Sequence, residues 1–163
     1  MKITILNTGG TFNKRYNLLN GELEVARDDL ALQDMIKYCY NIEFEIQNII
    51  SKDSLDMNDD DRKIIVDRIK DSKNENIIIV HGTDTIDLTA LYIDEKVKDK
   101  KVILFGSMLP FSIEKVEATL NFAQALGFLN ANILNGVYIS MHGSVKSYKN
   151  IYKDKEKGKF LNS

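Results

Sequence analysis

Short apolar runs alternate along this chain with longer segments whose apolar residues recur at helical spacing. The apolar runs predict five strands, at residues 2–7, 42–50, 76–80, 101–105 and 136–141. The helical spacing predicts helices that begin near Asp28, Asp59, Ile86 and Ser112. Strands that alternate with helices in this way are typical of crossover connections, which join parallel strands. We therefore predict an α/β fold of three layers, with a mainly parallel sheet and helices on both of its faces.

One segment departs from that alternation. Residues 15–25 form two short polar–apolar runs around Asn20-Gly21, a dipeptide that favours a type I′ hairpin turn. An exposed hairpin just after the first strand is a candidate flap. We expect residues 11–24 to be mobile without ligand, because an isolated two-stranded hairpin is only marginally stable.

Polar residues mark the predicted helix starts. Ser112 is the predicted cap of the last helix, with Glu114 as acidic support in its first turn. Residues 59–61 are three aspartates, which either a metal site or complementarity to the helix dipole explains. We favour the dipole. We also assign no metal to His81 or His142, because no carboxylates or third histidine are placed with them.

Length and composition fit a single soluble domain over residues 1–163. Hydrophobic residues make up 44% of the chain and charged residues 28%, and the net charge of -2 provides no field that would recruit nucleic acid or an anionic membrane. No apolar run approaches the ~20 residues of a membrane-spanning helix. The first strand follows Met1 directly, which leaves no room for a signal peptide. The only cysteine, Cys39, is predicted to lie buried in mid-helix with a packing role alone. The lone cysteine and the lack of a signal segment predict a cytoplasmic protein, and we predict no cofactor.

The end of the chain is rich in lysine, with six in residues 146–159. This segment is either a basic arm for nucleic acid or a solvated tail. We favour the tail, because Asp154 and Glu156 interrupt the lysines and no aromatic platform accompanies them. Residues 137–139 would then have no later element to cover them. Such an apolar surface predicts association into a homodimer, most simply with two-fold symmetry.

Small polar residues follow four of the predicted strands, at 8–11, 51–56, 81–85 and 106–108. The carboxyl ends of parallel strands meet at one edge of a sheet, and ligands bind there. Each turn alone is explained by helix caps and tight backbone. A phosphate site is the weaker alternative, because Gly9-Gly10 lacks the spacing of the nucleotide-binding glycine motifs. The recurrence of hydroxyl groups at neighbouring strand ends favours a catalytic or binding crevice.

Two of these turns resemble known signatures. The segment ITILNTGGTF at 3–12 is similar to the first signature of the L-asparaginase family, and IVHGTDT at 79–85 is similar to the second. The likeness continues through DSLDM at 53–57, GSM at 106–108 and VYISM at 137–141. It implies the flavodoxin-like fold of the N-terminal asparaginase domain. It also implies hydrolysis of asparagine, or of glutamine, to the acid and ammonia.

The resemblance implies a role for each matching residue. Thr11 would be the nucleophile, and Tyr16 on the candidate flap would help to activate it. Thr83 and Asp84 match the threonine and aspartate of the second signature, and Lys153 is the best match to the family's lysine. A threonine hydroxyl needs a nearby proton acceptor to attack at neutral pH. Either Tyr16 or Thr83, backed by Lys153 and Asp84, would serve.

The same resemblance implies the substrate contacts. Ser54 matches the serine that holds the substrate's α-carboxylate, and Asp84 would also receive the α-ammonium group. Asp53 and Ser107 lie in the matching segments and complete the predicted substrate-binding set.

The chain departs from the family in two respects. Family members have a second domain, which completes the neighbouring subunit's active site, and we expect it to be missing here. In addition, residues 141–144, MHGS, replace an asparagine-containing turn that ends in arginine. Three alternatives follow: a short asparaginase with weak turnover, a truncated piece, or a relic that binds an amino acid without turnover. A tRNA-dependent amidotransferase component shares both signatures and is a further alternative.

Overall fold

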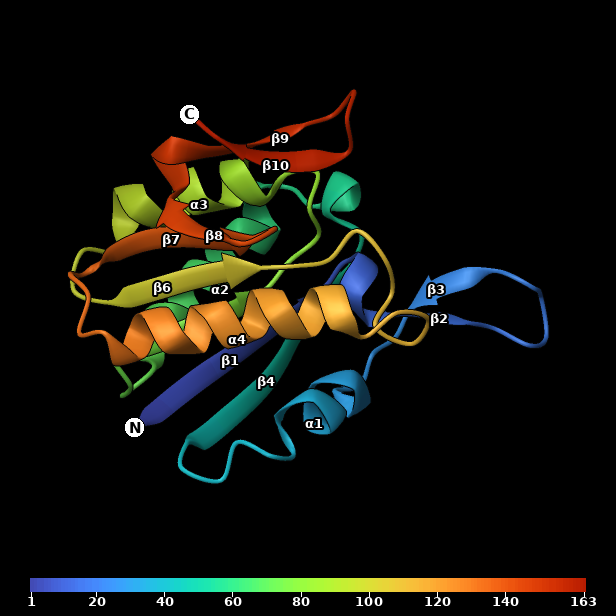
Figure 1. Ribbon diagram of the computed structural model, residues 1–163, viewed down its shortest axis with the longest axis horizontal. Helices are drawn as coiled ribbons and strands as arrows, with labels where there is room; N and C mark the ends of the chain where they lie inside the picture. The colour runs from blue at the N-terminus through green and yellow to red at the C-terminus, as the bar shows by residue number, and fades with distance from the viewer.

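Six strands form one sheet in the computed structural model, which describes residues 1–163. Their order is β4-β1-β5-β6-β7-β8 (Figure 1). The bounds are β1 Lys2–Gly9, β4 Glu43–Lys52, β5 Asn76–Val80, β6 Lys101–Phe105, β7 Gly136–Met141 and β8 Ser144–Ser147. The first five are parallel, and β8 pairs with β7 antiparallel as an edge strand. Numbered along the chain, the parallel strands lie in the order 2-1-3-4-5, which is the flavodoxin-like order.

Two helices cover each face of the sheet, so the prediction of three layers is confirmed. The helices are α1 Leu30–Ile36, α2 Asp59–Asp71, α3 Ile86–Lys96 and α4 Val116–Asn130. Alternate residues of the strands face opposite layers: Ile77 and Ile79 pack with α2 and α3, whereas Ile78 and Val80 pack with α1 and α4. Both layers bury their apolar residues, so the strand ends are held on a rigid frame.

Two predicted helix boundaries were wrong. The first helix ends at Ile36, and Cys39 follows it in a tight turn rather than lying in mid-helix. The thiol is half-buried, and burial raises its pKa. The last helix begins at Val116, not at Ser112, because 110–114 form a separate turn. The Glu114 carboxylate accepts the backbone N–H groups of residues 116 and 117, as a helix cap does.

The start of α2 behaves as predicted for a helix that complements its own dipole. Asn58 accepts the N–H group of Asp61, and the Asp61 carboxylate accepts the N–H group of Asn58, which forms a reciprocal capping box. The Lys52 ammonium also donates to Asp61 at 2.8 Å. The three aspartates of this turn therefore have a structural explanation.

The predicted hairpin exists, but its turn differs from the prediction. Strands β2 (Lys14–Tyr16) and β3 (Leu23–Val25) are joined by six residues, and the hairpin projects from the body of the molecule (Figure 1). Gly21 has φ +77°, but Asn20 is not among the residues with positive φ. A type I′ turn needs positive φ at both central positions, so this turn is of another kind.

The lysine-rich end is not a solvated tail, and this prediction was wrong. After β8 the chain forms a short helix, η3 (Tyr148–Asn150), and then the antiparallel pair β9 (Ile151–Asp154) and β10 (Lys159–Asn162). Ile151 and Phe160 are buried in the same core cluster as Val137 and Ile139. Five of the six lysines are exposed and only Lys153 faces inward, so a count of charges hides the alternation that is typical of strands.

The surface proposed for dimerisation is therefore covered within the chain itself. Val137 and Ile139 are 3% and 0% exposed. Tyr138 faces the other layer, where its ring packs edge-on against Phe128. The prediction of a homodimer depended on an exposed apolar strand, and that strand is buried within the chain.

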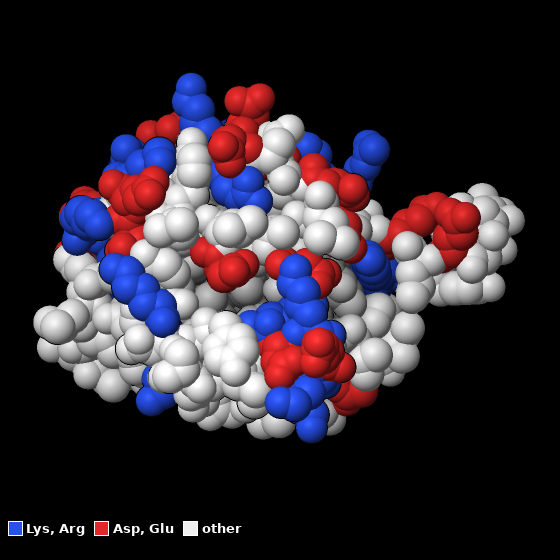
Figure 2. Space-filling view, turned by 90° about the horizontal axis from the view of Figure 1, so that it is seen from above, with Lys and Arg blue, Asp and Glu red and all other residues white.

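Charged side chains of both signs are interspersed over the face shown in Figure 2, with no extended patch of one sign. This face includes the lysine-rich end of the chain, where Lys157 pairs with Asp154 and Lys153 pairs with Asp84. None of the helices has the length and apolar character needed to cross a bilayer.

Candidate functional site

The polar turns meet at the point where the strand order reverses, between β1 and β5. Gly10 follows β1 with φ +67°, and a Cβ atom there would lie 2.4 Å from the Gly82 nitrogen. Only glycine permits this backbone contact. The contact joins the loop that carries Thr11 to the loop that carries Thr83. Both threonines therefore lie at one edge of the sheet, at the carboxyl ends of the strands where open α/β sheets bind ligands. We call this edge the crevice.

The turn after β4 packs against the loop that carries Thr83, because a Cβ atom on Gly82 would lie 2.7 Å from the Ser54 side chain. A short helix, η2 (Ser54–Asp56), begins there, and its Ser54 side chain is 1% exposed. Ser54 Oγ accepts the backbone N–H of Asp84 at 3.2 Å, and Thr85 Oγ1 donates to the Ser54 carbonyl at 2.8 Å. The Ser54 hydroxyl has no acceptor for its own hydrogen among these contacts. It is therefore available to donate to an anionic group of a ligand.

Lys153 joins this cluster from the far end of the sequence. Strand β9 places its ammonium group 2.8 Å from Thr83 Oγ1 and 2.7 Å from Asp84 Oδ1. The Lys153 side chain is 12% exposed, whereas Asp84 is 35% exposed and open on one side. The ammonium group orients the Thr83 hydroxyl by donating to it. One lone pair of the Thr83 oxygen then remains to accept a proton from another hydroxyl.

Thr11 is held at its backbone but not at its hydroxyl. It opens a short helix, η1 (Thr11–Asn13), whose next residue, Phe12, is fully buried against Phe105 and Phe111. The Gly10 N–H donates to the Lys52 carbonyl at 2.9 Å, which fixes the preceding turn. The Thr11 hydroxyl itself makes no side-chain hydrogen bond. Its backbone position is fixed while its hydroxyl group has no hydrogen-bond partner, which fits a nucleophile whose proton acceptor is not yet in contact.

Asp53 and Ser107 lie at the crevice but have local partners. The Asp53 carboxylate accepts from the Lys14 ammonium at 2.7 Å and from the Leu55 N–H. Burial alone would raise the Asp53 pKa, but the Lys14 ammonium and two backbone N–H groups outweigh burial and lower it. Ser107 is buried after β6, and its hydroxyl donates to the Leu109 carbonyl at 2.5 Å. These two side chains support the loops around the crevice.

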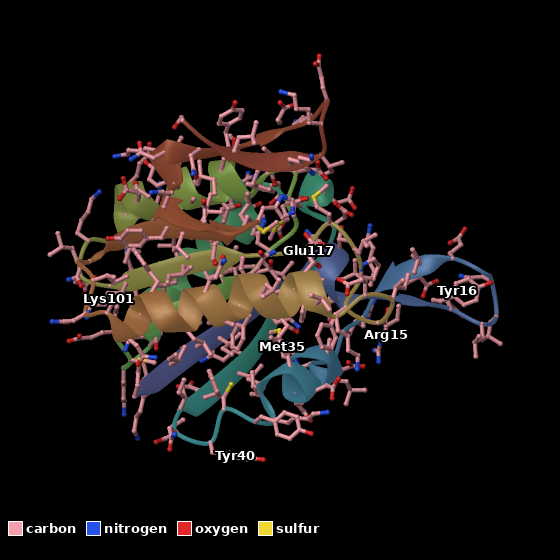
Figure 3. All side chains as sticks on the ribbon, viewed as in Figure 1. Arg15, Tyr16, Met35, Tyr40, Lys101 and Glu117 are labelled. Carbon is pink, nitrogen blue, oxygen red and sulfur yellow. The ribbon has the colours of Figure 1, made fainter.

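Tyr16 is the one predicted site residue that lies away from the others. It stands on the projecting hairpin and points toward the hairpin's own turn (Figure 3). Its side chain is 59% exposed, and its hydroxyl is 3.4 Å from the position that a Cβ atom on Gly21 would occupy. In this arrangement Tyr16 does not reach Thr11. The hairpin would have to swing over the crevice to bring it there.

His81 lies under the Thr83 loop and is fully buried. Its Nδ1 is 2.7 Å from the Gly82 carbonyl, which can only accept, so Nδ1 carries the proton. Nε2 has no partner. Burial lowers the His81 pKa to about 4, and the nearby Arg62 guanidinium adds to the effect. The neutral ring thus braces the Gly82 backbone, which touches the Gly10 loop.

A second polar cluster lies beside the crevice, and sequence reasoning missed it. Glu117 and Asn121 of α4 contact His142, and the His142 ring contacts Phe160 of β10. The only sequence signal for this cluster is His142, which lies in a Met-His-Gly turn where the resemblance to the family breaks down. Its partners lie 18 to 25 residues away, so residue spacing could not reveal them.

Comparison with known proteins agrees with this geometry. Residues 2–158 match the family described as "Asparaginase, N-terminal". The chain is 29% identical over 162 residues to L-asparaginase 2 of Escherichia coli, which covers 93% of this chain and 46% of that protein. It is 33% identical over 150 residues to a glutamyl-tRNA(Gln) amidotransferase component of Methanococcus maripaludis, with 86% and 35% covered. The chain thus spans about half or less of the length of these relatives.

Solved structures show the same fold. The thermostable L-asparaginase from Thermococcus kodakarensis superposes with a TM-score of 0.86 at 24% identity, covering 99% of this chain and 51% of that one. A probable cytoplasmic L-asparaginase from Campylobacter jejuni gives 0.83, also at 24% identity, with 99% and 52% covered. At this level of identity the match establishes the fold alone.

Proposed function

Because the chain belongs to the asparaginase family, we propose that its crevice hydrolyses the side-chain amide of asparagine to aspartate and ammonia, with Thr11 as the nucleophile. The observation that carries this proposal is the Lys153 ammonium group, which contacts both Thr83 Oγ1 and Asp84 Oδ1. A lysine 69 to 70 residues away in sequence converges on the two polar residues of the second signature. Capping of α3 does not require a lysine at this place, so the contact of Lys153 with Thr83 and Asp84 is not explained by helix capping alone.

The proposed reaction begins with attack of the Thr11 oxygen on the amide carbon. The Thr11 proton passes to Thr83 Oγ1, whose orientation the Lys153 ammonium fixes, while the Thr83 hydroxyl gives its own proton to the leaving nitrogen. Once the hairpin closes, the Tyr16 hydroxyl is the alternative relay. The C–N bond then breaks, ammonia leaves with a proton, and an ester links Thr11 to the acyl group. Water attacks this ester and releases the acid, so Thr11 regains its hydroxyl. We propose that backbone N–H groups at the start of α3 stabilise the oxyanion, a contribution of ~3–4 kcal/mol per donor.

The proposed substrate contacts use the opposite ends of an α-amino acid. The Ser54 hydroxyl hydrogen is free to donate to the α-carboxylate. The exposed side of the Asp84 carboxylate is free to accept the α-ammonium group, since Lys153 occupies one oxygen only. The two anchors are already adjacent, because the Asp84 N–H donates to Ser54 Oγ.

Ammonia release from asparagine by the purified chain tests the proposal. We expect weak turnover, because the second domain of the family is not part of this chain. Thr11→Ala should reduce it to background, while Thr119→Ala, at an exposed threonine on α4, should leave it unchanged. Equal ammonia release by the wild type and Thr11→Ala would overturn the assignment of the nucleophile. Glutamine assayed beside asparagine measures which acyl chain length the crevice accepts.

Calorimetric titration with aspartate tests the anchors separately from turnover. Asp84→Ala and Ser54→Ala should each weaken binding by at least tenfold, since each removes a charge-assisted contact worth about 1.5–3 kcal/mol. Ser107→Ala should bind as the wild type does, because the Ser107 hydroxyl is engaged with Leu109. Unchanged heats for Asp84→Ala would contradict this binding mode.

A second candidate function is suggested by the relative named as a component of glutamyl-tRNA(Gln) amidotransferase, which matches this chain at 33% identity. We propose as the alternative that the same threonine chemistry supplies ammonia within a larger amidotransferase. Its test is a comparison of free asparagine with glutamyl-tRNA as ligands. Binding of that tRNA together with weak hydrolysis of free asparagine favours the alternative, and strong hydrolysis without tRNA binding favours the first proposal.

A further inference from the structure

His142 joins the carboxyl end of β7 to two other elements. Its backbone N–H donates to Asn121 Oδ1 at 2.9 Å, and its Nε2 lies 3.0 Å from Glu117 Oε1. Its Nδ1 lies 3.1 Å from the Phe160 backbone nitrogen. A backbone N–H group can only donate, so Nδ1 is the acceptor and the ring proton is on Nε2. The Nε2–H group therefore donates to Glu117, and both ring nitrogens are used.

The residue adopts a backbone conformation that this pattern of contacts requires. His142 has φ +48°, and the only other residue besides glycine with positive φ is Asn132. A side chain in the left-handed region costs about 1–2 kcal/mol unless its surroundings compensate. The three hydrogen bonds supply this compensation, together with the Phe160 ring, which packs edge-on against the imidazole at 5.7 Å.

The contact with Phe160 leads directly to the proposed catalytic lysine. Phe160 of β10 lies opposite Lys153 of β9 in the antiparallel register. Directly opposite residues of such a pair share one face of the hairpin. The Phe160 ring is 6% exposed in the core, and Lys153 on the same face reaches Thr83 and Asp84. A shift of β10 relative to β7 would therefore move Lys153 relative to Thr83.

The other side of the cluster holds the end of β6. The Glu117 carboxylate accepts the N–H groups of Met108 and Leu109, at 2.8 to 3.2 Å. Asn121 Nδ2 donates to the Gly106 carbonyl at 3.0 Å. A Cβ atom on Gly106 would be 3.3 Å from Thr83 Cγ2, so this turn packs against Thr83. Helix α4 thus holds the wall of the crevice through the same two side chains that hold His142.

We infer that His142 is a positioning residue that fixes the β9–β10 hairpin, and with it the Lys153 ammonium group, against Thr83. It touches neither substrate nor reacting atom. It acts through Phe160 on one side and through Glu117 and Asn121 on the other. This inference rests on the proposed function for its kinetic consequence, but its structural consequence can be measured without turnover.

Three variants separate the roles of the ring. Asparagine tolerates positive φ, and its side-chain oxygen can replace Nδ1 as acceptor, so His142→Asn keeps the contact with Phe160. Glycine accepts the backbone conformation but has no acceptor, so His142→Gly loses that contact. Asn132→Gly is the matched control, because it makes the same kind of backbone change at an exposed position at the opposite end of β7.

Kinetics give the first readout. His142→Gly should lower kcat about tenfold or more, since small displacements of a catalytic group have large effects on rate. KM should change less than kcat, because the Ser54 hydroxyl and the Asp84 backbone N–H are held together without β9 or β10, and only one Asp84 oxygen contacts Lys153. His142→Asn should recover most of the loss, and Asn132→Gly should match the wild type. Equal kcat for His142→Gly and the wild type would overturn the inference. So would a kcat of His142→Asn as low as that of His142→Gly.

Hydrogen exchange of the Phe160 N–H group gives a readout that does not depend on catalysis. Its exchange should be slow in the wild type and in His142→Asn, and at least tenfold faster in His142→Gly at equal global stability. Unchanged exchange in His142→Gly would refute the positioning role, even in an active enzyme. If the wild type released no ammonia while Phe160 exchange followed this pattern, the proposed function would fail and the role of His142 in fixing the hairpin would stand.

Discussion

Two hairpins border the crevice, and they are attached to the molecule in opposite ways. In β9–β10, Ile151 and Phe160 are buried in the core, and Lys153 makes two hydrogen bonds at the crevice. In β2–β3, the hairpin projects into solvent, and Leu18 and Leu19 at its end are 89% and 97% exposed (Figure 1). One hairpin thus delivers its functional side chain already in place, whereas the other holds Tyr16 away from the crevice.

The attachments of β2–β3 lie only at its base. Lys14 pairs with Asp53, Arg15 pairs with Asp28, and the Ser112 hydroxyl donates to the Lys14 carbonyl. Ion pairs at such part-exposed positions contribute about 0–1 kcal/mol each. The hairpin can therefore move as a unit about its base at little energetic cost. The difference suggests that the β5–β9 side of the crevice is preorganised and that the β2–β3 side closes after the substrate binds.

The largest expected effect is on the preorganised side. Lys153→Met should lower kcat by about 10³-fold, because the group that orients Thr83 for proton transfer is lost and such groups contribute about 10²–10⁴-fold. Steady-state ammonia release measures the effect. Lys155→Met, two residues away and exposed, is the matched control and should retain full activity. A loss of less than tenfold in Lys153→Met would mean that Thr83 needs no orientation by the ammonium group.

The second effect concerns the stability of the same side. The His81 pKa is lowered to about 4 in the folded chain, from an ordinary value of 6.5. Below pH 6.5 the unfolded chain binds a proton that the folded chain refuses, so the free energy of unfolding falls as the pH drops toward 4. The total loss attributable to His81 is about 3 kcal/mol. No such loss arises above pH 6.5, where the ring is neutral in both states.

Urea unfolding at pH 7.5, 5.5 and 4.5 measures this dependence. His81→Asn should have lower stability at pH 7.5 but a clearly flatter profile between pH 6.5 and 4. His142→Asn, run in parallel, accounts for the other histidine of the chain. An identical slope for His81→Asn and the wild type would show that the buried ring does not carry the acid sensitivity.

How well the sequence predicts each part of the site depends on how far apart in the sequence the contacting residues lie. The strand ends that hold Thr11, Ser54 and Thr83 follow from apolar runs, and the parallel order brings such ends together. Those inferences need only local periodicity and one rule of topology. Lys153 was selected by resemblance alone, because no local pattern shows which of six lysines faces inward.

The errors at the end of the chain and at Ser112 share one physical cause: contacts with residues far away in the sequence decide which structure each segment adopts. The segment 144–162 contains few apolar residues, yet Phe160 and Ile151 complete the core, and they fold the segment into strands. Ser112 has the side chain of a helix cap, but its hydroxyl donates to the Lys14 carbonyl, 98 residues earlier. Composition and spacing carry no information about partners at that distance.

The third effect tests whether β2–β3 closes. Tyr16→Phe should lower kcat about 10²-fold if the hydroxyl takes part in proton transfer after closure. The free energy of unfolding should change by less than about 0.5 kcal/mol, because the side chain is largely exposed. Tyr38→Phe, at another exposed tyrosine, is the control for activity and stability. Wild-type kcat in Tyr16→Phe would leave Thr83 as the sole proton acceptor and remove the need for closure.

The smallest effect compares the two hairpins directly. Gly21 in β2–β3 and Gly158 in β9–β10 have φ of +77° and +61°, so alanine at either position is strained by about 1 kcal/mol. In Gly21→Ala the strain should act on the hairpin alone. Exchange of the amides of residues 14–25 should then rise about fivefold, and the urea midpoint should not change.

In Gly158→Ala the same strain should appear in the global free energy of unfolding, as a loss of about 1 kcal/mol. The reason is that β9–β10 cannot open without exposing Phe160 and Ile151, so its local opening is coupled to loss of the core. No atom lies within 4 Å of the added Cβ at Gly158, so a steric clash does not confuse the comparison. Amide exchange and urea unfolding on both variants decide the matter. If both substitutions changed only local exchange, the two hairpins would be equally independent of the core, and Lys153 would need closure as much as Tyr16 does.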